Sequence, residues 1–142
     1  MKIFKILDNK FCRDIYNLNN SLSVRKYSIN KKKFSYKSHL KWFKQLLNSN
    51  KLKGYIILKN NVKIGFIKTV KKKNSLEVSW SVFKSMRSKG YGKKILLEFT
   101  KKFPEKYTAQ ILENNLRSIQ VCNYSNFKPY FKKKNILYFK NF

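Results

Sequence analysis

The sequence predicts a mixed α/β fold in which helices flank one central, mostly antiparallel sheet of about six to seven strands. The chain has 142 residues, the length of one domain, so we expect residues 1–142 to form a single unit. Hydrophobic residues make up 42% of it and aromatic residues 16%, which is enough apolar surface for a core. Segments with a two-residue hydrophobic period are interspersed with segments of helical period along the whole chain.

The first half of the chain predicts two helices and three strands. Helices are indicated where apolar residues recur every three or four positions, and Ser35 is a suitable N-cap for the second one. The turn Lys59-Asn60-Asn61 between two apolar runs is typical of a hairpin. A polar stretch between the helices is expected to be a loop or a broken helix. In order, the expected elements are a strand at 2–7, a helix at 10–20, the irregular stretch at 19–33, a helix at 35–48, and strands at 55–58 and 62–67.

The second half predicts four further strands and two helices. Residues 75–83 alternate strictly, with Glu77, Ser79 and Ser81 on one face and apolar side chains on the other. Because a strand covered on both faces is normally apolar throughout, the polar row indicates the wall of a cleft. In order, the expected elements are a strand at 75–83, a helix from 93 to Pro104, a strand at 107–112, a helix at 115–123, and two short strands within 127–139.

The charge of the chain is extreme, but its composition argues against a nucleic-acid partner. Lys and Arg number 34 against 6 Asp and Glu, a net charge of +28, yet only 4 of the 34 are Arg. A surface selected to bind phosphates or bases would use more Arg, whose planar side chain binds them bidentately. We therefore expect a solvated lysine surface, shaped by a coding bias toward A and T, that attracts small anionic molecules.

The sequence contains no sign of a membrane, secretory or metal-binding segment. No apolar run approaches the roughly 18 residues of a membrane span, and no sustained apolar run follows the basic start. Cys12 and Cys122 are too few and too far apart to indicate a disulfide framework or a zinc site. We expect a cytoplasmic protein and leave open whether it forms a homodimer.

A glycine-rich turn at residues 82–93 joins a predicted strand to a predicted helix. Gly90 and Gly92 allow successive backbone N–H groups to converge at the positive end of the helix dipole, as in an anion site. The alternative is a tight turn without a ligand, because short glycine patterns are weak evidence. Three basic side chains accompany the turn: Arg87, Lys89 and Lys93.

Two motifs in the second half resemble the GNAT superfamily of acetyl-CoA-dependent N-acetyltransferases. Residues 87–92, Arg-Ser-Lys-Gly-Tyr-Gly, are similar to its pyrophosphate loop, Arg/Gln-x-x-Gly-x-Gly/Ala. The family's second pattern, an apolar strand end followed by Asn and then Ala or Ser, is matched by Ile111, Asn115 and Ser118, and Asn126-Phe127 stands in register with its Gly-Phe pair. The resemblance covers essentially the whole chain and implies acetyl-CoA as co-substrate. The binding residues it implies are Val82, Phe83, Arg87, Ser88, Lys89, Gly90, Tyr91, Gly92, Lys93, Asn115 and Ser118.

The resemblance also implies catalytic residues, with two departures from the family pattern. Members often use a Glu on the fourth strand as general base, which corresponds to Glu77; the alternative is an ordinary paired Glu. Many members use a Tyr on the helix after the fifth strand as general acid. That position is Cys122 here, and Tyr124 lies two residues later, about 200° around the helix. Ser88 replaces a usual Gly, which is tolerable if its φ is negative.

The N-terminal third resembles GNAT members that act on nucleotide-linked amino sugars, of the pseudaminic-acid-pathway type. The similarity lies in Val24-Arg25, Phe34-Ser35 and His39-Leu40-Lys41-Trp42-Phe43. It implies that Arg25 meets a phosphate and that Trp42 stacks on a sugar or uracil, with His39 and Ser79 lining the same site. The alternatives are that Trp42 is a core residue and His39 a surface residue.

The function predicted from these features is acetyl transfer to a primary amine of a nucleotide-linked amino sugar, a small anionic acceptor. Two alternatives stay open at this point. One is N-terminal acetylation of a ribosomal protein, against which the positive charge of the chain argues mildly because that acceptor is basic. The other is a non-catalytic module that binds RNA or CoA.

Overall fold

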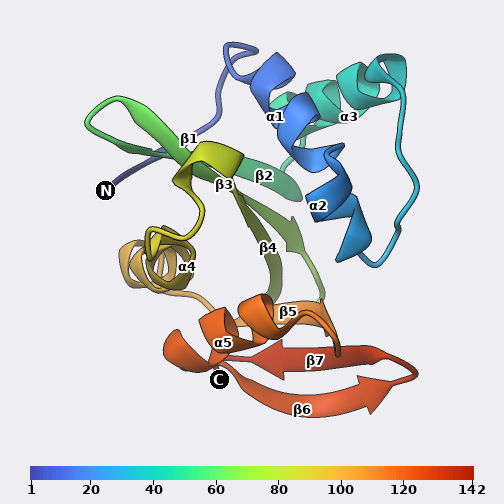
Figure 1. Ribbon diagram of the computed structural model, residues 1–142, viewed down its shortest axis with the longest axis vertical. Helices are drawn as coiled ribbons and strands as arrows, with labels where there is room; N and C mark the ends of the chain where they lie inside the picture. The colour runs from blue at the N-terminus through green and yellow to red at the C-terminus, as the bar shows by residue number, and fades with distance from the viewer.

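The computed structural model describes residues 1–142 as one seven-stranded sheet with helices on both faces (Figure 1). The strand order is β1-β2-β3-β4-β5-β7-β6, and every neighbouring pair is antiparallel except β4 and β5, which are parallel. This confirms the predicted fold class. The elements are β1 (Lys2–Lys5), α1 (Cys12–Asn19), α2 (Leu22–Lys26), α3 (Tyr36–Asn48), β2 (Leu52–Lys59), β3 (Val62–Lys71), β4 (Leu76–Val82), the 3₁₀ turn η1 (Lys84–Met86), α4 (Tyr91–Lys102), β5 (Tyr107–Leu112), α5 (Leu116–Tyr124), β6 (Lys128–Lys133) and β7 (Ile136–Lys140).

Two hydrophobic cores lie on opposite faces of the sheet. On one face α1 and α3 pack against β2 and β3, and the largest side chains buried there include Ile15, Phe43 and Phe66. On the other face α4 and α5 cover β3, β4 and β5, with Phe99 and Val78 in the core. Figure 1 shows α1–α3 grouped together and α4 and α5 on their own side. None of the helices is long and apolar enough to cross a membrane.

Local sequence signals account for the turns that position these elements. The Ser35 side chain accepts a hydrogen bond from the Ser38 N–H at 3.1 Å, as expected of an N-cap. The β2–β3 hairpin turns through Asn60 and Asn61, whose φ values are 51° and 63°. Asn tolerates this left-handed region better than most residues, which suits a two-residue hairpin turn. Asn126 has a φ of 64°, as its register with a family glycine predicted.

Strands β4 and β5 pair over only two residues and then separate. The paired residues are Leu76 with Tyr107 and Glu77 with Thr108. The Leu76 N–H donates to the Lys106 carbonyl at 2.9 Å on the β5 side, and strand alternation turns the Trp80 N–H toward that same side. Because the pairing has ended by Trp80, β4 presents backbone polar groups to the opening between the strands. Figure 1 shows this divergence near the middle of the sheet.

Candidate functional site

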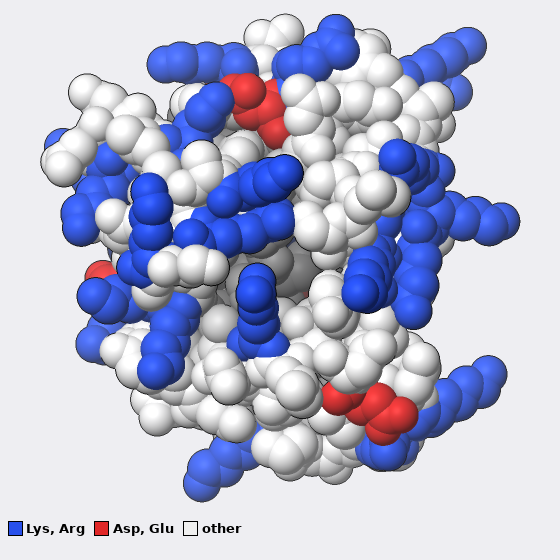
Figure 2. All heavy atoms as spheres, viewed as in Figure 1, with Lys and Arg blue, Asp and Glu red and all other residues white.

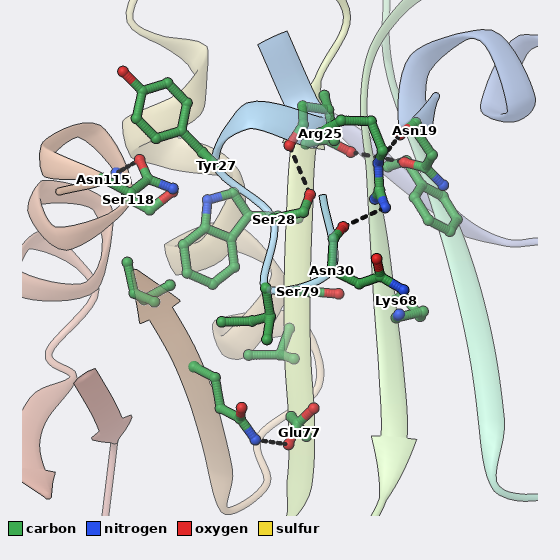
Figure 3. Close-up of a pocket in the computed structure, with 18 of the residues that line it drawn as sticks. Asn19, Arg25, Tyr27, Ser28, Asn30, Lys68, Glu77, Ser79, Asn115 and Ser118 are labelled. Atoms are coloured by element: carbon green, nitrogen blue, oxygen red, sulfur yellow. Dashed lines mark hydrogen bonds between the residues drawn. The ribbon is translucent and has the colours of Figure 1, made fainter. Parts of the chain in front are cut away.

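A cavity of about 690 Å³ lies beside the β4–β5 opening, on the face of the sheet that carries α1–α3 (Figure 3). Its floor includes the polar row of β4, Glu77, Ser79 and Ser81, as the strict alternation of this strand predicted. The apolar residues of the same strand face the other way, and Val78 is 1% exposed in the α4–α5 core. The same strand therefore contributes both to the core and to the wall of the cavity.

Glu77 lies in this cavity where β4 and β5 are still paired. Its Oε2 accepts a hydrogen bond from Gln110 Nε2 at 3.0 Å and lies 3.9 Å from Lys72 Nζ. Gln110 is on β5 and also lines the cavity, so it holds the carboxylate from across the strand junction. The side chain of Glu77 keeps 28% of its surface exposed, which leaves the carboxylate accessible to a ligand.

Arg25 organises the segment that closes the opposite side of the cavity. Its Nε donates to the Asn19 carbonyl at 2.8 Å, and its Nη1 donates to the Asn30 carbonyl at 2.7 Å. Its guanidinium also lies 5.3 Å from the ring centroid of Phe34. These contacts tie the irregular stretch after α2 back to α1, and the side chain still lines the cavity.

His39 and Trp42 lie on α3 and reach the same cavity. Their ring centroids are 5.5 Å apart, and Trp42 also makes an edge contact with Phe66 on β3. His39 is 1% exposed, in contrast to the surface position considered as its alternative. Its Nε2 lies 2.8 Å from the carbonyl of Cys12, and because a carbonyl can only accept, the ring donates from Nε2. The structure thus brings Arg25, His39, Trp42 and Ser79 to one cavity, and their role toward an acceptor stays a prediction.

We expect the stability of the protein to fall as the pH is lowered from 7.5 to 5.5, because of His39. Burial lowers the pKa of His39 below its ordinary value of 6.5, and the bond to Cys12 offsets this only in part. The unfolded chain therefore binds the proton first, and stability is lost as the pH falls from 6.5 toward the folded-state pKa. His39 is the only histidine in the chain, so urea unfolding of the His39→Gln variant should depend less on pH in this range. Equal pH dependence in the two proteins would contradict this.

The glycine turn begins α4 and faces open space. Gly90 is the N-cap residue with a φ of 82°, and a Cβ built on it would meet no atom within 4 Å. Arg87 lies beside the turn, where its Nε donates to the Val82 carbonyl at 3.0 Å and its Nη1 to Ser23 Oγ at 2.7 Å. Burial, and then the positive charge of Arg117, lower the pKa of Arg87. Free space, a helix N-terminus and clustered cations together fit a pyrophosphate group.

Lys and Arg side chains surround this side of the molecule. Figure 2 shows them gathered around a hollow near the middle of the visible face, where Figure 1 places the gap between α2, α4 and α5. The hollow adjoins the β4–β5 opening. An anion that enters here meets a positive field, which also raises its local concentration.

Ser88 has a φ of 61°, so the condition under which this Ser would be tolerable, a negative φ, is not met. A left-handed conformation costs a non-glycine residue about 1–2 kcal/mol. We expect Ser88→Gly to be at least as stable as the wild type in thermal unfolding. A β-branched residue is least suited to positive φ, so Ser88→Val should lower the free energy of unfolding by more than about 1 kcal/mol. A Ser88→Val protein as stable as the wild type would show that the loop does not require this conformation.

Asn115 and Ser118 form the N-terminal cap of α5 at the rim of the cavity. The Asn115 side chain accepts a hydrogen bond from the Ser118 N–H at 3.3 Å, and both residues line the cavity. Figure 3 shows the pair on the side of the cavity opposite Arg25. Of the residues that the resemblance implies for acetyl-CoA, Asn115 and Ser118 thus line this cavity, whereas none of residues 82–93 does.

Residues 9–128 of this chain match a family model, which is described as "Acetyltransferase (GNAT) domain". The chain belongs to the GNAT family. It is an N-acetyltransferase whose co-substrate is acetyl-CoA. A search of curated proteins finds no match.

Solved structures of two acetyltransferases and of one further domain share this fold at low sequence identity. Campylobacter jejuni N-acetyltransferase PseH, in complex with acetyl coenzyme A, is 16% identical with a TM-score of 0.74, and the alignment covers 98% of this chain and 97% of PseH. Vibrio cholerae spermidine N-acetyltransferase, in complex with CoA and spermine, is 12% identical with a TM-score of 0.79, covering 98% and 92%. A Methanocaldococcus jannaschii domain is 22% identical with a TM-score of 0.77, covering 98% and 96%.

The residues predicted as the acid of this GNAT enzyme lie outside the cavity lining. Cys122 is 0% exposed within the α4–α5 core, and its burial raises the pKa of its thiol to about 12. Tyr124 is 43% exposed at the end of α5, with Lys93 Nζ 5.2 Å from its ring centroid. The geometry adds no support for either side chain as a proton donor, so both roles stay predictions.

Sequence reasoning missed several residues that line the cavity of the GNAT domain. Tyr27, Ser28 and Asn30 come from the stretch read as irregular, and no periodic pattern could have placed them. Lys68 did leave a signal, because it interrupts the apolar run of β3. Gln110 was also missed, and its polar side chain within the largely buried strand β5 was a comparable signal.

Proposed function

We propose that this GNAT enzyme transfers the acetyl group of acetyl-CoA to a primary amine of a nucleotide-linked amino sugar. The observation that carries the proposal is one cavity, lined by Arg25, Trp42 and Glu77, next to the β4–β5 opening. An arginine suits a phosphate, an aromatic ring suits a sugar or base face, and a carboxylate suits an amine. The resemblance of residues 24–43 to amino-sugar N-acetyltransferases supports the same acceptor.

The residues of the chain divide the reaction between them. Acetyl-CoA, when bound, would supply the thioester carbonyl as electrophile, and the backbone N–H groups of residues 87–92 would hold its pyrophosphate. Glu77 takes a proton from the acceptor ammonium, which leaves a neutral amine able to attack. The Trp80 N–H, turned toward the strand opening, would donate to the acyl oxygen as negative charge develops on it. The C–S bond then breaks, and CoA leaves as a thiolate that takes up, through solvent, the second proton lost by the attacking nitrogen. Gln110 keeps the Glu77 carboxylate in position through the hydrogen bond at 3.0 Å.

Arg25→Ala and Trp42→Ala are each expected to raise KM for the amino-sugar substrate without changing CoA affinity. Arg25→Ala removes the charge that would meet the substrate phosphate, and it also releases the segment after α2 that Arg25 holds. We expect these two effects together to weaken substrate binding by about tenfold or more. Lys41→Ala, on the exposed side of α3, is the matched control. Thermal unfolding must accompany these assays, because truncating a buried aromatic can cost about 3–5 kcal/mol.

The assay for this proposal detects free CoA thiol with a panel of UDP-linked amino sugars. Release of thiol with one or more members supports the proposal. The rate constant kcat/KM should fall as salt is added, since exposed charges are screened within about 8–10 Å at physiological ionic strength. If the protein binds CoA but releases no thiol with any member of the panel, the proposed acceptor is contradicted.

A further inference from the structure

We propose that Lys68 and Arg25 form a cationic subsite that binds a phosphate group of the acceptor while the acceptor amine lies at Glu77. This inference rests on the proposed function and adds a residue, Lys68, that the sequence patterns left unassigned. Its basis is the placement of two cations and one carboxylate around a single cavity.

Strand register directs Lys68 into the cavity. Lys68 pairs with Ser79 of β4 and with Gly54 of β2, so its side chain shares the α1–α3 face with Ser79. Gly54 contributes no side chain, and Leu46 of α3 fills the space above it. The Lys68 side chain is half-buried and lines the cavity. Figure 3 shows it below Arg25 and beside Asn30, with Glu77 further along the floor.

The positive charge of Lys68 has no dedicated partner in the protein. No carboxylate lies within salt-bridge distance of its ammonium; the ion pairs of the chain join Lys63 to Asp14, Lys72 to Glu77 and Lys132 to Glu113. Burial lowers the pKa of Lys68; the charge of Glu77 raises it, and the charges of Arg25 and Lys72 lower it further. An anion placed between Lys68 and Arg25 would relieve the repulsion between these two cations.

The balance of charge around the cavity favours an anionic acceptor over a polycationic one. Glu77 is the one carboxylate among the lining residues, and Gln110 already donates to it. Arg25 is held by two backbone carbonyls, so its charge is in place before the ligand arrives and little reorganisation is needed. A polyamine would bring further positive charge toward Lys68 and Arg25, whereas a phosphorylated amine would meet a cation at one end and Glu77 at the other.

The test measures ligand binding by calorimetry to protein saturated with CoA, so that phosphates cannot occupy the CoA site. Two matched pairs of ligands are used: UDP with uridine, and glucosamine 6-phosphate with glucosamine. In the wild type, the phosphorylated member of at least one pair should bind about tenfold more tightly or better. This preference should fall about tenfold in Lys68→Gln and persist in Lys68→Arg, which keeps the charge. Lys41→Gln, which removes a charge from the exposed side of α3, is the control and should keep the preference.

The outcomes separate the subsite from the proposed function. Equal affinity within both pairs, no detectable binding of any ligand, or a preference unchanged in a folded Lys68→Gln protein would overturn the subsite. If UDP-amino sugars are acetylated all the same, the proposed function survives that result. If glucosamine 6-phosphate alone shows the Lys68-dependent preference, the subsite stands and the nucleotide part of the proposed function fails.

Discussion

Replacing Glu77 by Gln is expected to lower kcat by about 10²–10⁴-fold, because a positioned general base contributes that much to a proton transfer. The substitution keeps the shape of the side chain and removes its basicity. CoA affinity should change little, since Glu77 lies at the junction of β4 and β5, away from the glycine turn. Steady-state kinetics with an identified acceptor, together with CoA titration, measure both quantities.

Ser81→Ala is the matched control for Glu77→Gln. Ser81 lies in the same polar row of β4, and its hydroxyl donates to Asn19 Oδ1 at 3.4 Å instead of facing the strand junction. We expect its effect on kcat to be several-fold at most. If Glu77→Gln retains kcat within a few-fold of the wild type, Glu77 is not the base, and deprotonation by solvent becomes the better explanation.

Replacing Gly90 by Val is expected to abolish measurable CoA binding. Gly90 has a φ of 82°, which a β-branched residue adopts only with strain, and the open space before it would be filled by the new side chain. Both effects displace the backbone N–H groups that would hold the pyrophosphate. Isothermal titration with CoA measures the loss.

Gly90→Asn separates the two causes. Asn tolerates positive φ, so this variant keeps the backbone conformation and adds a side chain only at the mouth of the turn. We expect it to unfold at a temperature close to that of the wild type and to bind CoA more weakly than the wild type but more tightly than Gly90→Val. Wild-type CoA affinity in a folded Gly90→Val protein would show that the pyrophosphate does not approach this backbone.

Periodic patterns were sufficient to predict the strands and the longer helices. The expected strand at 107–112 coincides with β5, and the alternation over 75–83 placed the polar row of β4 in the cavity. Strand order, by contrast, depends on long-range pairing that no local pattern encodes. The extent of strand pairing is equally hidden from local patterns. Strands β4 and β5 separate after two paired residues, although both continue as regular strands beyond that point.

The residues that close the site were harder to predict from local patterns. Helix α2 has five residues and none is buried, so it has no apolar face to detect. Arg25 holds the following stretch through hydrogen bonds to backbone carbonyls. Every residue has a backbone carbonyl, so the sequence does not indicate which ones Arg25 will bind. The positive φ of Ser88 follows from the geometry of the turn, against the preference of the residue itself. These positions depend on tertiary structure.

The most direct test of the proposed acceptor is a competition for one limiting supply of acetyl-CoA. The enzyme is offered equal concentrations of a UDP-linked amino sugar panel, spermidine and an N-terminal peptide of a ribosomal protein, and the acetylated products are quantified by mass spectrometry. We predict that acetyl groups accumulate on a UDP-linked amino sugar and that spermidine stays almost unmodified. Preferential acetylation of spermidine or of the peptide, with every UDP-linked sugar unmodified, would contradict the proposed function.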